Sequence, residues 1–267
     1  MTEKRKGARS TKDIPGAILQ QLNEGTIETA NLVEWLSVDQ RLLLSNILKH
    51  NNRIHYLQSV LDEIDQLKKQ TVNTINEAIG TRLFMLTIEN NDTAFSTLLM
   101  QHSADIVRCW ATYFIGKNQQ LSIEKKLEAI KLFAADEHFG VREICWMAVR
   151  KDITDQLKKS IDILSTWAID ENPNVRRFAC ESIRPRGVWC THIDVLKQQP
   201  ELALPVLNPL KSDPAKYVQD SVGNWLNDAS KTRPDFVQII CQKWKEESDT
   251  KATGYIIRKA LRTLNKE

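Results

Sequence analysis

Apolar residues recur along most of this chain at intervals of three and four positions, which is the spacing of one face of an α-helix. From Ile14 onward, such helical segments follow one another with only short breaks. The run Ser37-Val-Asp-Gln40 has the capping-box pattern that opens a helix, and Ser122 opens another. The pattern therefore predicts an all-α protein.

A short motif repeats in the second half of the chain. A Val-Arg step followed by an amphipathic helix begins at residues 107, 141 and 175, and weaker versions begin at 218 and 257. Periods of roughly 34 to 43 residues with two helices per unit indicate an α-solenoid of HEAT or armadillo type. We expect a right-handed superhelix that forms a single HEAT-like repeat domain over residues 14–267, preceded by a basic flexible arm over residues 1–13.

The helices that follow these steps divide into an apolar stripe and a polar face. The stripes contain Val175, Phe178, Ala179 and Ile183 in one helix and Val218, Val222, Trp225 and Leu226 in the next. The opposite faces carry Arg177, Glu181 and Arg184, and then Asp220, Asn224, Asn227 and Asp228. Because the apolar stripes face the core, stacking is expected to align the polar faces into one exposed concave surface suited to a long ligand.

Composition and charge narrow this picture. Only 9 glycines and 8 prolines are present, which argues against a β-rich fold with many tight turns. The net charge is +3, so nucleic-acid binding would depend on a local basic surface rather than on the whole molecule. The five cysteines show no disulfide or zinc spacing. No secretory leader or apolar span is apparent, and we expect a cytoplasmic protein with no membrane partner, no metal and no cofactor.

One segment concentrates the chemistry. Residues 174–189 read NVRRFACESIRPRGVW, with four arginines, one glutamate and a closing tryptophan. The planar fork of arginine binds phosphate through two hydrogen bonds, so this stripe is typical of contact with a nucleic-acid backbone. A solvated, salt-bridged helix face would explain the same charges.

The run RRFACESIRPRGVW, followed by LKSDPAKYVQDSVGNWLNDASKTRPDFV, resembles the signature of the DNA alkylation repair glycosylases of the AlkC/AlkD type, particularly the AlkC branch. The resemblance is specific from about Trp167 to Phe236. It implies hydrolysis of the N-glycosidic bond of cationic alkylpurines, chiefly 3-methyladenine, in double-stranded DNA and without base flipping. It assigns carboxylate chemistry to Asp228 and Glu181 and an aromatic contact to Trp189.

The basic and polar side chains of this region are the expected DNA-binding set. It comprises Arg142, Arg176, Arg177, Arg184, Arg186, Lys211, Lys216, Tyr217, Asn224 and Lys231. The sequence gives no sign of an obligate oligomer, so a monomer is expected.

The sequence departs from the family pattern at two positions of interest. An earlier repeat of the AlkC branch carries a further catalytic glutamate, and His138 occupies that position here. Glu137 or Glu143 could take over its role, or the role could be absent. Val218-Gln219 replaces a Val-Arg step, which would remove one phosphate contact. Two other hypotheses therefore stay open: a non-catalytic protein that binds damaged or branched DNA, and a HEAT-type scaffold for a protein partner.

Overall fold

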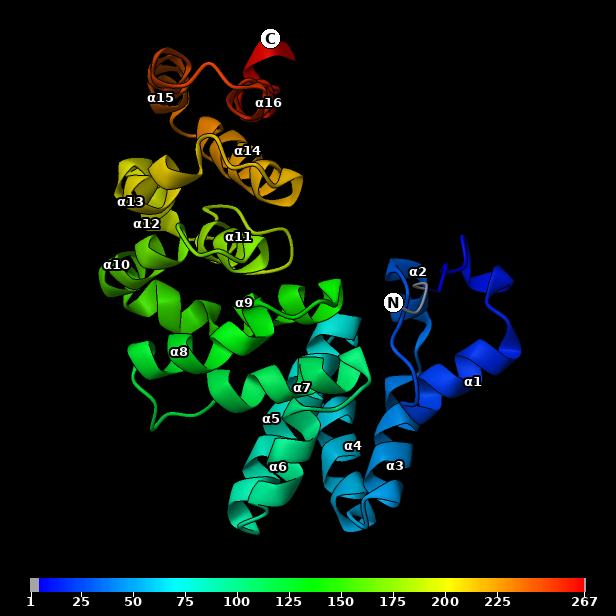
Figure 1. Ribbon diagram of the computed structural model, residues 1–267. Coiled ribbons are helices and arrows are strands. Elements are labelled where there is room, and N and C mark those ends of the chain that lie inside the picture. The colour runs from blue at the N-terminus through cyan, green and yellow to red at the C-terminus, as the bar shows by residue number, and fades with distance from the viewer. Residues whose placement is uncertain (1–4, 267) are drawn as a thin grey trace. The chain divides into compact units, whose positions relative to one another are not determined.

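The computed structural model describes residues 5–266 and shows helices joined by turns and loops, with no strand in that range (Figure 1). The chain divides into two compact units. Unit 1 comprises Met1–Gln120 and Glu137–Ala148, and unit 2 comprises Leu121–Asp136 and Val149–Glu267. Helix α9 (Phe139–Asp155) begins in unit 1 and ends in unit 2. The single repeat domain over residues 14–267 stays a prediction.

Unit 1 contains helices in which sequence neighbours pack on each other. They are α1 (Gly16–Glu24), α2 (Leu32–Ser37), α3 (Gln40–His50), α4 (Leu57–Asp65), α5 (Val72–Glu89), α6 (Thr93–Met100) and α7 (Asp105–Gly116). Helix α3 packs on α1 and α4, and α5 packs on α4, α6 and α7. The predicted capping box at Ser37 is wrong: α3 begins at Gln40, where the Asp39 carboxylate accepts two backbone N–H bonds, while Ser37 ends α2.

Unit 2 contains stacked helix pairs. Its helices are α8 (Ile123–Ala134), α10 (Leu157–Trp167), α11 (Pro173–Glu181), α12 (Asp194–Gln198), α13 (Leu204–Leu207), α14 (Lys216–Ser230), α15 (Pro234–Glu247) and α16 (Lys251–Ala260). Ser122 caps α8 as predicted. Helix α11 packs on α14, α14 packs on α16, and α10 packs on α13. Successive pairs therefore bury their apolar faces against one another, as repeats of this kind require.

The repeated step has a constant position within the helices. Val107, Val141, Val175 and Val218 are each the third residue of their helix, in α7, α9, α11 and α14, and all four are buried. Ile257 lies instead in the middle of α16, so the fifth step is out of register. The apolar stripes predicted for α11 and α14 are buried in full.

The residue after each valine holds the preceding loop. Arg108 and Arg176 each donate to the backbone carbonyls six and five residues earlier, at 2.8 and 2.9 Å in both cases. Gln219 donates to the equivalent carbonyls at 2.8 and 3.4 Å. The arginine of the step is thus a structural donor in α7 and α11, and glutamine reproduces its contacts in α14.

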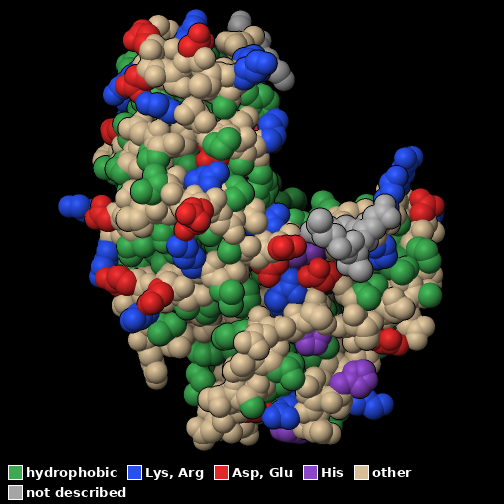
Figure 2. All heavy atoms as spheres, viewed as in Figure 1, with side chains coloured by type: hydrophobic (Ala, Val, Ile, Leu, Met, Phe, Trp, Pro, Cys, Tyr) green, Lys and Arg blue, Asp and Glu red, His purple; other side chains and the backbone are tan. Residues whose placement is uncertain are grey.

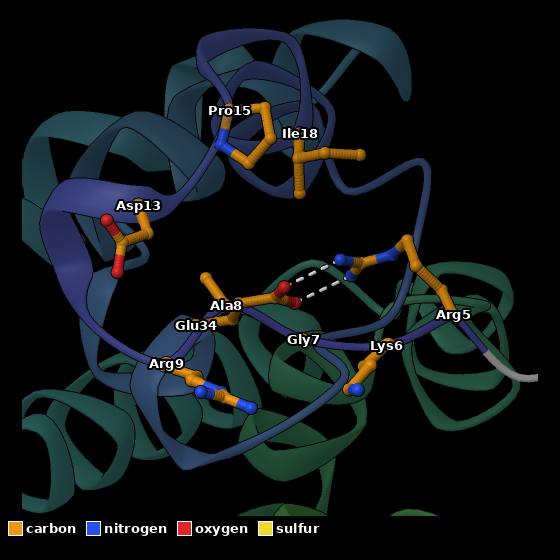
Figure 3. A pocket seen from close by; sticks show the side chains of 9 residues that line it. All are labelled: Arg5, Lys6, Gly7, Ala8, Arg9, Asp13, Pro15, Ile18 and Glu34. Carbon is orange, nitrogen blue, oxygen red and sulfur yellow. Dashed lines mark hydrogen bonds and ion pairs between the residues drawn. The ribbon is translucent and has the colours of Figure 1, made fainter.

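The N-terminal arm contacts unit 1 from Arg5 onward, and Lys4 lies outside the described residues. Arg5 donates to both carboxylate oxygens of the buried Glu34, each at 2.6 Å (Figure 3). The arm borders a cavity of about 500 Å³ that shares no lining residue with unit 2. The flexibility of the arm over residues 1–13 stays a prediction. No helix among the described residues is long and apolar enough to cross a bilayer.

Candidate functional site

The two carboxylates that the sequence singled out are held by one arginine in unit 2. Glu181 ends α11 and Asp228 lies near the end of α14, and their side chains are 5% and 4% exposed. Arg184 Nη1 donates to Glu181 Oε1 at 2.7 Å. Arg184 Nε and Nη2 donate to Asp228 Oδ2 at 3.0 and 2.6 Å. The guanidinium therefore joins both acids into one buried cluster.

Further polar groups complete this acidic cluster. Ser221 Oγ donates to Glu181 Oε2 at 2.6 Å, and Arg177 Nη2 lies 3.7 Å from the same oxygen. Asp228 Oδ1 is contacted by Lys231 Nζ at 3.3 Å, and the lysine side chain is 44% exposed. The partner of Oδ1 is therefore a half-exposed lysine, whereas Oδ2 is bound by the largely buried guanidinium of Arg184.

Neighbouring charges shift the pKa values of Glu181 and Arg184. Burial raises the pKa of Glu181, but Arg177, Arg184 and the Ser221 hydroxyl outweigh burial, so the pKa falls below its ordinary value. Burial lowers the pKa of Arg184, and the two carboxylates raise it further than burial lowers it. Glu181 is therefore an anion at neutral pH, suited to stabilising positive charge rather than to donating a proton.

The expectation that the polar faces of α11 and α14 are exposed is wrong for four residues, which are all buried: Arg177, Glu181, Asn227 and Asp228. Helix α14 packs over the side of α11 that carries Arg177 and Glu181. Helix α16 packs on α14, and Asn227 donates to the carbonyl of Ala260. The guanidinium of Arg177 lies over the ring of Tyr217, 4.4 Å from its centroid. A helical wheel shows which residues share a face, but it does not show which face the next repeat covers.

The loop after α11 carries the predicted aromatic contact. Trp189 is 74% exposed, and Val188 beside it is exposed as well. Arg186 lies in the same loop, and its Nε is buried without a hydrogen-bond partner among the described residues. The loop thus presents an aromatic face and an unsatisfied guanidinium donor.

The other predicted DNA-binding residues have varied surroundings. Arg176 is bound to Asp213 and to loop carbonyls. Lys211 pairs with Glu247, and Arg142 lies on α9 in unit 1. Asn224 Oδ1 accepts a bond from Arg262 at 2.9 Å. No observation tests DNA contact by any of them, and these assignments stay predictions.

The sequence analysis missed the part that α16 plays in a charged cluster around Asp220 of α14. Lys259 and the Tyr255 hydroxyl bond Asp220 of α14 at 2.5 and 2.6 Å, and Lys216 bonds the same carboxylate at 2.9 Å. Burial raises the pKa of Asp220, while these three donors lower it to about 2. The signal was the run YIIRKALR, in which Arg262 follows Arg258 by four residues and Lys259 by three. In Figure 2, the visible face of unit 2 shows cationic and acidic side chains interspersed.

His138 belongs to a separate buried network in unit 1. Its Nε2 lies 2.7 Å from the carbonyl oxygen of Thr29, and its Nδ1 lies 3.3 Å from Asp105 Oδ2. Asp105 also accepts bonds from the Thr29 amide and hydroxyl at 3.0 and 2.8 Å. His138 therefore ties the loop before α2 to α7 and α9, which is a structural role. Glu137 is exposed, and Glu143 accepts a bond from Trp146 Nε1 at 3.1 Å.

Fold and site together define a class: a protein of stacked helical repeats with a buried acidic cluster, followed by a loop that carries an exposed tryptophan. Among residues 5–266, no three His, Cys, Asp or Glu side chains are grouped to hold a metal ion. Residues 141–264 match the family model of DNA alkylation repair enzymes. This segment contains Glu181, Trp189 and Asp228, so the part of the chain that carries the candidate site is similar to the DNA alkylation repair enzymes.

One curated relative matches a large part of the chain. The uncharacterized protein YhaZ of Bacillus subtilis is 36% identical over 183 residues, which cover 65% of this chain and 50% of that protein. This chain therefore spans about half the length of the curated relative that it matches.

Two solved structures share the architecture. The alkylpurine DNA glycosylase AlkC of Pseudomonas fluorescens, bound to DNA containing an abasic site analog, superposes with a TM-score of 0.67 at 21% identity, covering 97% of this chain and 66% of that one. AlkD2 of Streptococcus mutans gives a TM-score of 0.57 at 23% identity, covering 78% and 98%. These similarities confirm the fold class predicted from the sequence, an all-helical solenoid of HEAT-like repeats.

Proposed function

We propose that this chain is a DNA glycosylase that removes cationic alkylated purines from double-stranded DNA, with 3-methyladenine as the chief substrate and 7-methylguanine as a second one. The observation that carries the proposal is the cluster of Glu181, Arg184 and Asp228, which holds two carboxylates beside the loop of an exposed tryptophan. The family match over residues 141–264 supports it. We place the protein in the bacterial cytoplasm or nucleoid, acting as a monomer without a cofactor.

The chemistry follows from the charge of the substrate. An N3- or N7-alkylated purine is already cationic, so it leaves as a neutral base when the bond from C1′ to the purine nitrogen breaks. Positive charge then develops on the sugar, and carboxylates close to that position stabilise it. Water forms the new bond to C1′ and releases one proton. Asp228 Oδ1 is the oxygen that we assign to the sugar and the water, because Arg184 occupies Oδ2.

The remaining residues have supporting roles in this proposal. Glu181 adds negative charge and, through Arg184, fixes the orientation of Asp228. The exposed Trp189 offers its ring face to the cationic base, a contact worth roughly 0.5–2 kcal/mol. Arg186, Lys216 and Lys231 are the side chains that we assign to DNA phosphates. No base has to enter a closed pocket, in agreement with excision without base flipping.

The test is release of free 3-methyladenine and 7-methylguanine from methylated duplex DNA by the wild type and by Asp228→Asn. We expect the wild type to release base and the variant to be slower by a factor on the order of 100 to 1,000, the usual effect of removing one electrostatic group from a reacting centre. DNA affinity should change little. Full activity of Asp228→Asn would remove Asp228 from the chemistry.

A second function is favoured by one observation. His138 stands where the resemblance places a further glutamate, and it is buried in the network with Thr29 and Asp105. A protein that binds damaged DNA without cleaving the glycosidic bond would fit this substitution. Salt-sensitive DNA binding with no base release by the wild type would identify that function and make Glu181 and Asp228 structural.

A further inference from the structure

The loop that carries Trp189 closes on itself. The amide of the buried Ile193 donates to the carbonyl of Pro185 at 3.1 Å, so the two ends of the loop meet. Compact loops with joined ends of this kind, Ω-loops, are frequently functional. There is little free space inside, because a Cβ atom at Gly187 would overlap Cys190 Sγ.

A single side chain from α9 holds both ends of this loop. Arg150 is only 4% exposed. Its Nη1 and Nη2 donate to the carbonyls of Ser182 and Arg184, just after α11, at 2.7 and 2.6 Å. Its Nε donates to the carbonyl of Thr191, near the end of the loop, at 3.2 Å. One guanidinium therefore ties the start of the loop to its end.

The contacts explain why arginine occupies this position. Burial lowers the pKa of Arg150, which shows that the cation is held at a cost in desolvation. Carbonyls at the end of a helix carry partial negative charge and favour a cation there. A lysine has the charge but lacks the fork that reaches separate acceptors, so it could not hold all three carbonyls in the same geometry.

We propose that Arg150 is the positioning residue of the candidate site and holds the Trp189 loop in place relative to the carboxylates. Arg150 bonds the backbone carbonyl of Arg184, while the side chain of Arg184 bonds Glu181 and Asp228. The loop backbone and the acidic cluster are therefore fixed to each other through these two arginines. The consequence for catalysis rests on the proposed function, but the effect on the loop does not.

The loop can be observed directly by fluorine NMR of protein labelled with 5-fluorotryptophan. The chain has 7 tryptophans, and Trp189→Phe identifies the resonance of Trp189. In Arg150→Gln we expect the Trp189 resonance to shift or broaden while the resonances of distant, buried tryptophans stay in place. The matched control is Lys151→Gln, which removes one positive charge from the next residue, whose side chain is 85% exposed. The control should leave the Trp189 resonance unchanged.

A second variant and a rescue separate positioning from general stability. Arg150→Lys keeps the charge and should still displace the Trp189 resonance, since the fork is lost. Added guanidinium ion, at a concentration that leaves the wild type folded, should restore the resonance in Arg150→Gln. An unmoved Trp189 resonance in both variants would overturn the proposal. So would a shift of every tryptophan in both variants, because Arg150 would then be a general fold residue.

Single-turnover base release gives the catalytic readout. We expect Arg150→Gln and Arg150→Lys to slow release by a factor on the order of 10 to 100 while DNA affinity stays within a few-fold, because a small misplacement of a contacting group has effects of this size. Unchanged release with a displaced loop would overturn the role in positioning for catalysis. If the wild type releases no base, the proposed function fails, and the Trp189 resonance still decides whether Arg150 holds the loop.

Discussion

Asp105 of unit 1 and Glu181 of unit 2 are both buried carboxylates, but their surroundings shift their pKa values in opposite directions. In unit 1, burial raises the pKa of Asp105, and His138 and the Thr29 hydrogen bonds only partly oppose this. In unit 2, burial also raises the pKa of Glu181, but two arginines and a serine outweigh burial and lower it. The comparison shows that depth of burial alone does not set the state of an acid. The hydrogen-bond and charge partners decide whether the pKa of a buried acid rises or falls, and therefore how easily the acid is ionised.

This difference assigns different roles to the two networks. Asp105 and His138 join a loop to two helices and use neutral hydrogen-bond partners from Thr29. Glu181 keeps its negative charge because Arg177, Arg184 and Ser221 outweigh the effect of burial on its pKa, and Arg184 also bonds Asp228. Negative charge held in place before the substrate arrives is what a cationic transition state requires. We therefore expect the chemistry at Glu181 and Asp228 rather than at Asp105.

The largest loss of stability is expected from Arg184→Met. The substitution leaves two buried carboxylates without their shared cation, and breaking a buried ion pair from one side costs about 3–5 kcal/mol. Urea unfolding monitored by circular dichroism measures the loss. Arg184→Lys, which keeps the charge, is the control and should lose less. A loss in Arg184→Met no larger than that of a surface substitution would show that the cluster is not electrostatically coupled.

A smaller effect is expected on stability. The loss of stability in Glu181→Gln and the loss in Asp105→Asn should change with pH in opposite directions. The lowered pKa of Glu181 gives stability that is present above its ordinary value of 4.5 and lost as the pH falls through the lower folded value. The raised pKa of Asp105 gives stability that is present below its ordinary value of 3.8 and lost as the pH rises through the higher folded value.

Thermal unfolding of each variant beside the wild type, between about pH 3 and about pH 7, tests these trends. The deficit of Glu181→Gln should shrink toward acid, and the deficit of Asp105→Asn should shrink toward neutral pH. Each change should be on the order of 1 kcal/mol. Parallel trends in both variants would contradict the contrast between the two units.

DNA binding offers a finer test of which unit contacts the backbone. Arg186→Ala should reduce the slope of log affinity against log salt by about 1, the amount expected for one lost phosphate contact. The matched control is Arg41→Ala in unit 1, where Arg41 pairs with Asp65 on the surface. Binding isotherms at several salt concentrations provide the slopes. An equal reduction in both variants would show that the backbone contact is not confined to the Arg186 loop.

The smallest effect is expected from Gln219→Arg, which restores the Val-Arg step in α14. Gln219 already donates to the loop carbonyls that Arg108 and Arg176 contact in their own repeats. Stability should therefore change by less than about 1 kcal/mol, as for substitutions that keep the same hydrogen bonds. The salt slope of DNA binding should stay the same. A steeper slope would show that this position contacts phosphate after all.

The sequence by itself determined the helical-repeat architecture. Apolar spacing and the recurring valine are local signals, and each valine marks the same helix position because every repeat buries it in the same way. The motif around Glu181, Trp189 and Asp228 likewise pointed to the DNA alkylation repair enzymes, whose family model matches the segment that contains these residues.

The tertiary structure alone decided how these residues meet. The sequence predicted that Arg184 binds phosphate. Only the packing of α14 on α11 places Arg184 between two carboxylates. Arg150 gave no signal, because its acceptors are backbone carbonyls more than thirty residues away, which carry no side-chain identity. A sequence pattern records which side chains share a helix face. The neighbouring repeat supplies the partner of a buried charge, so the partner is known only when the packing of the repeats is known.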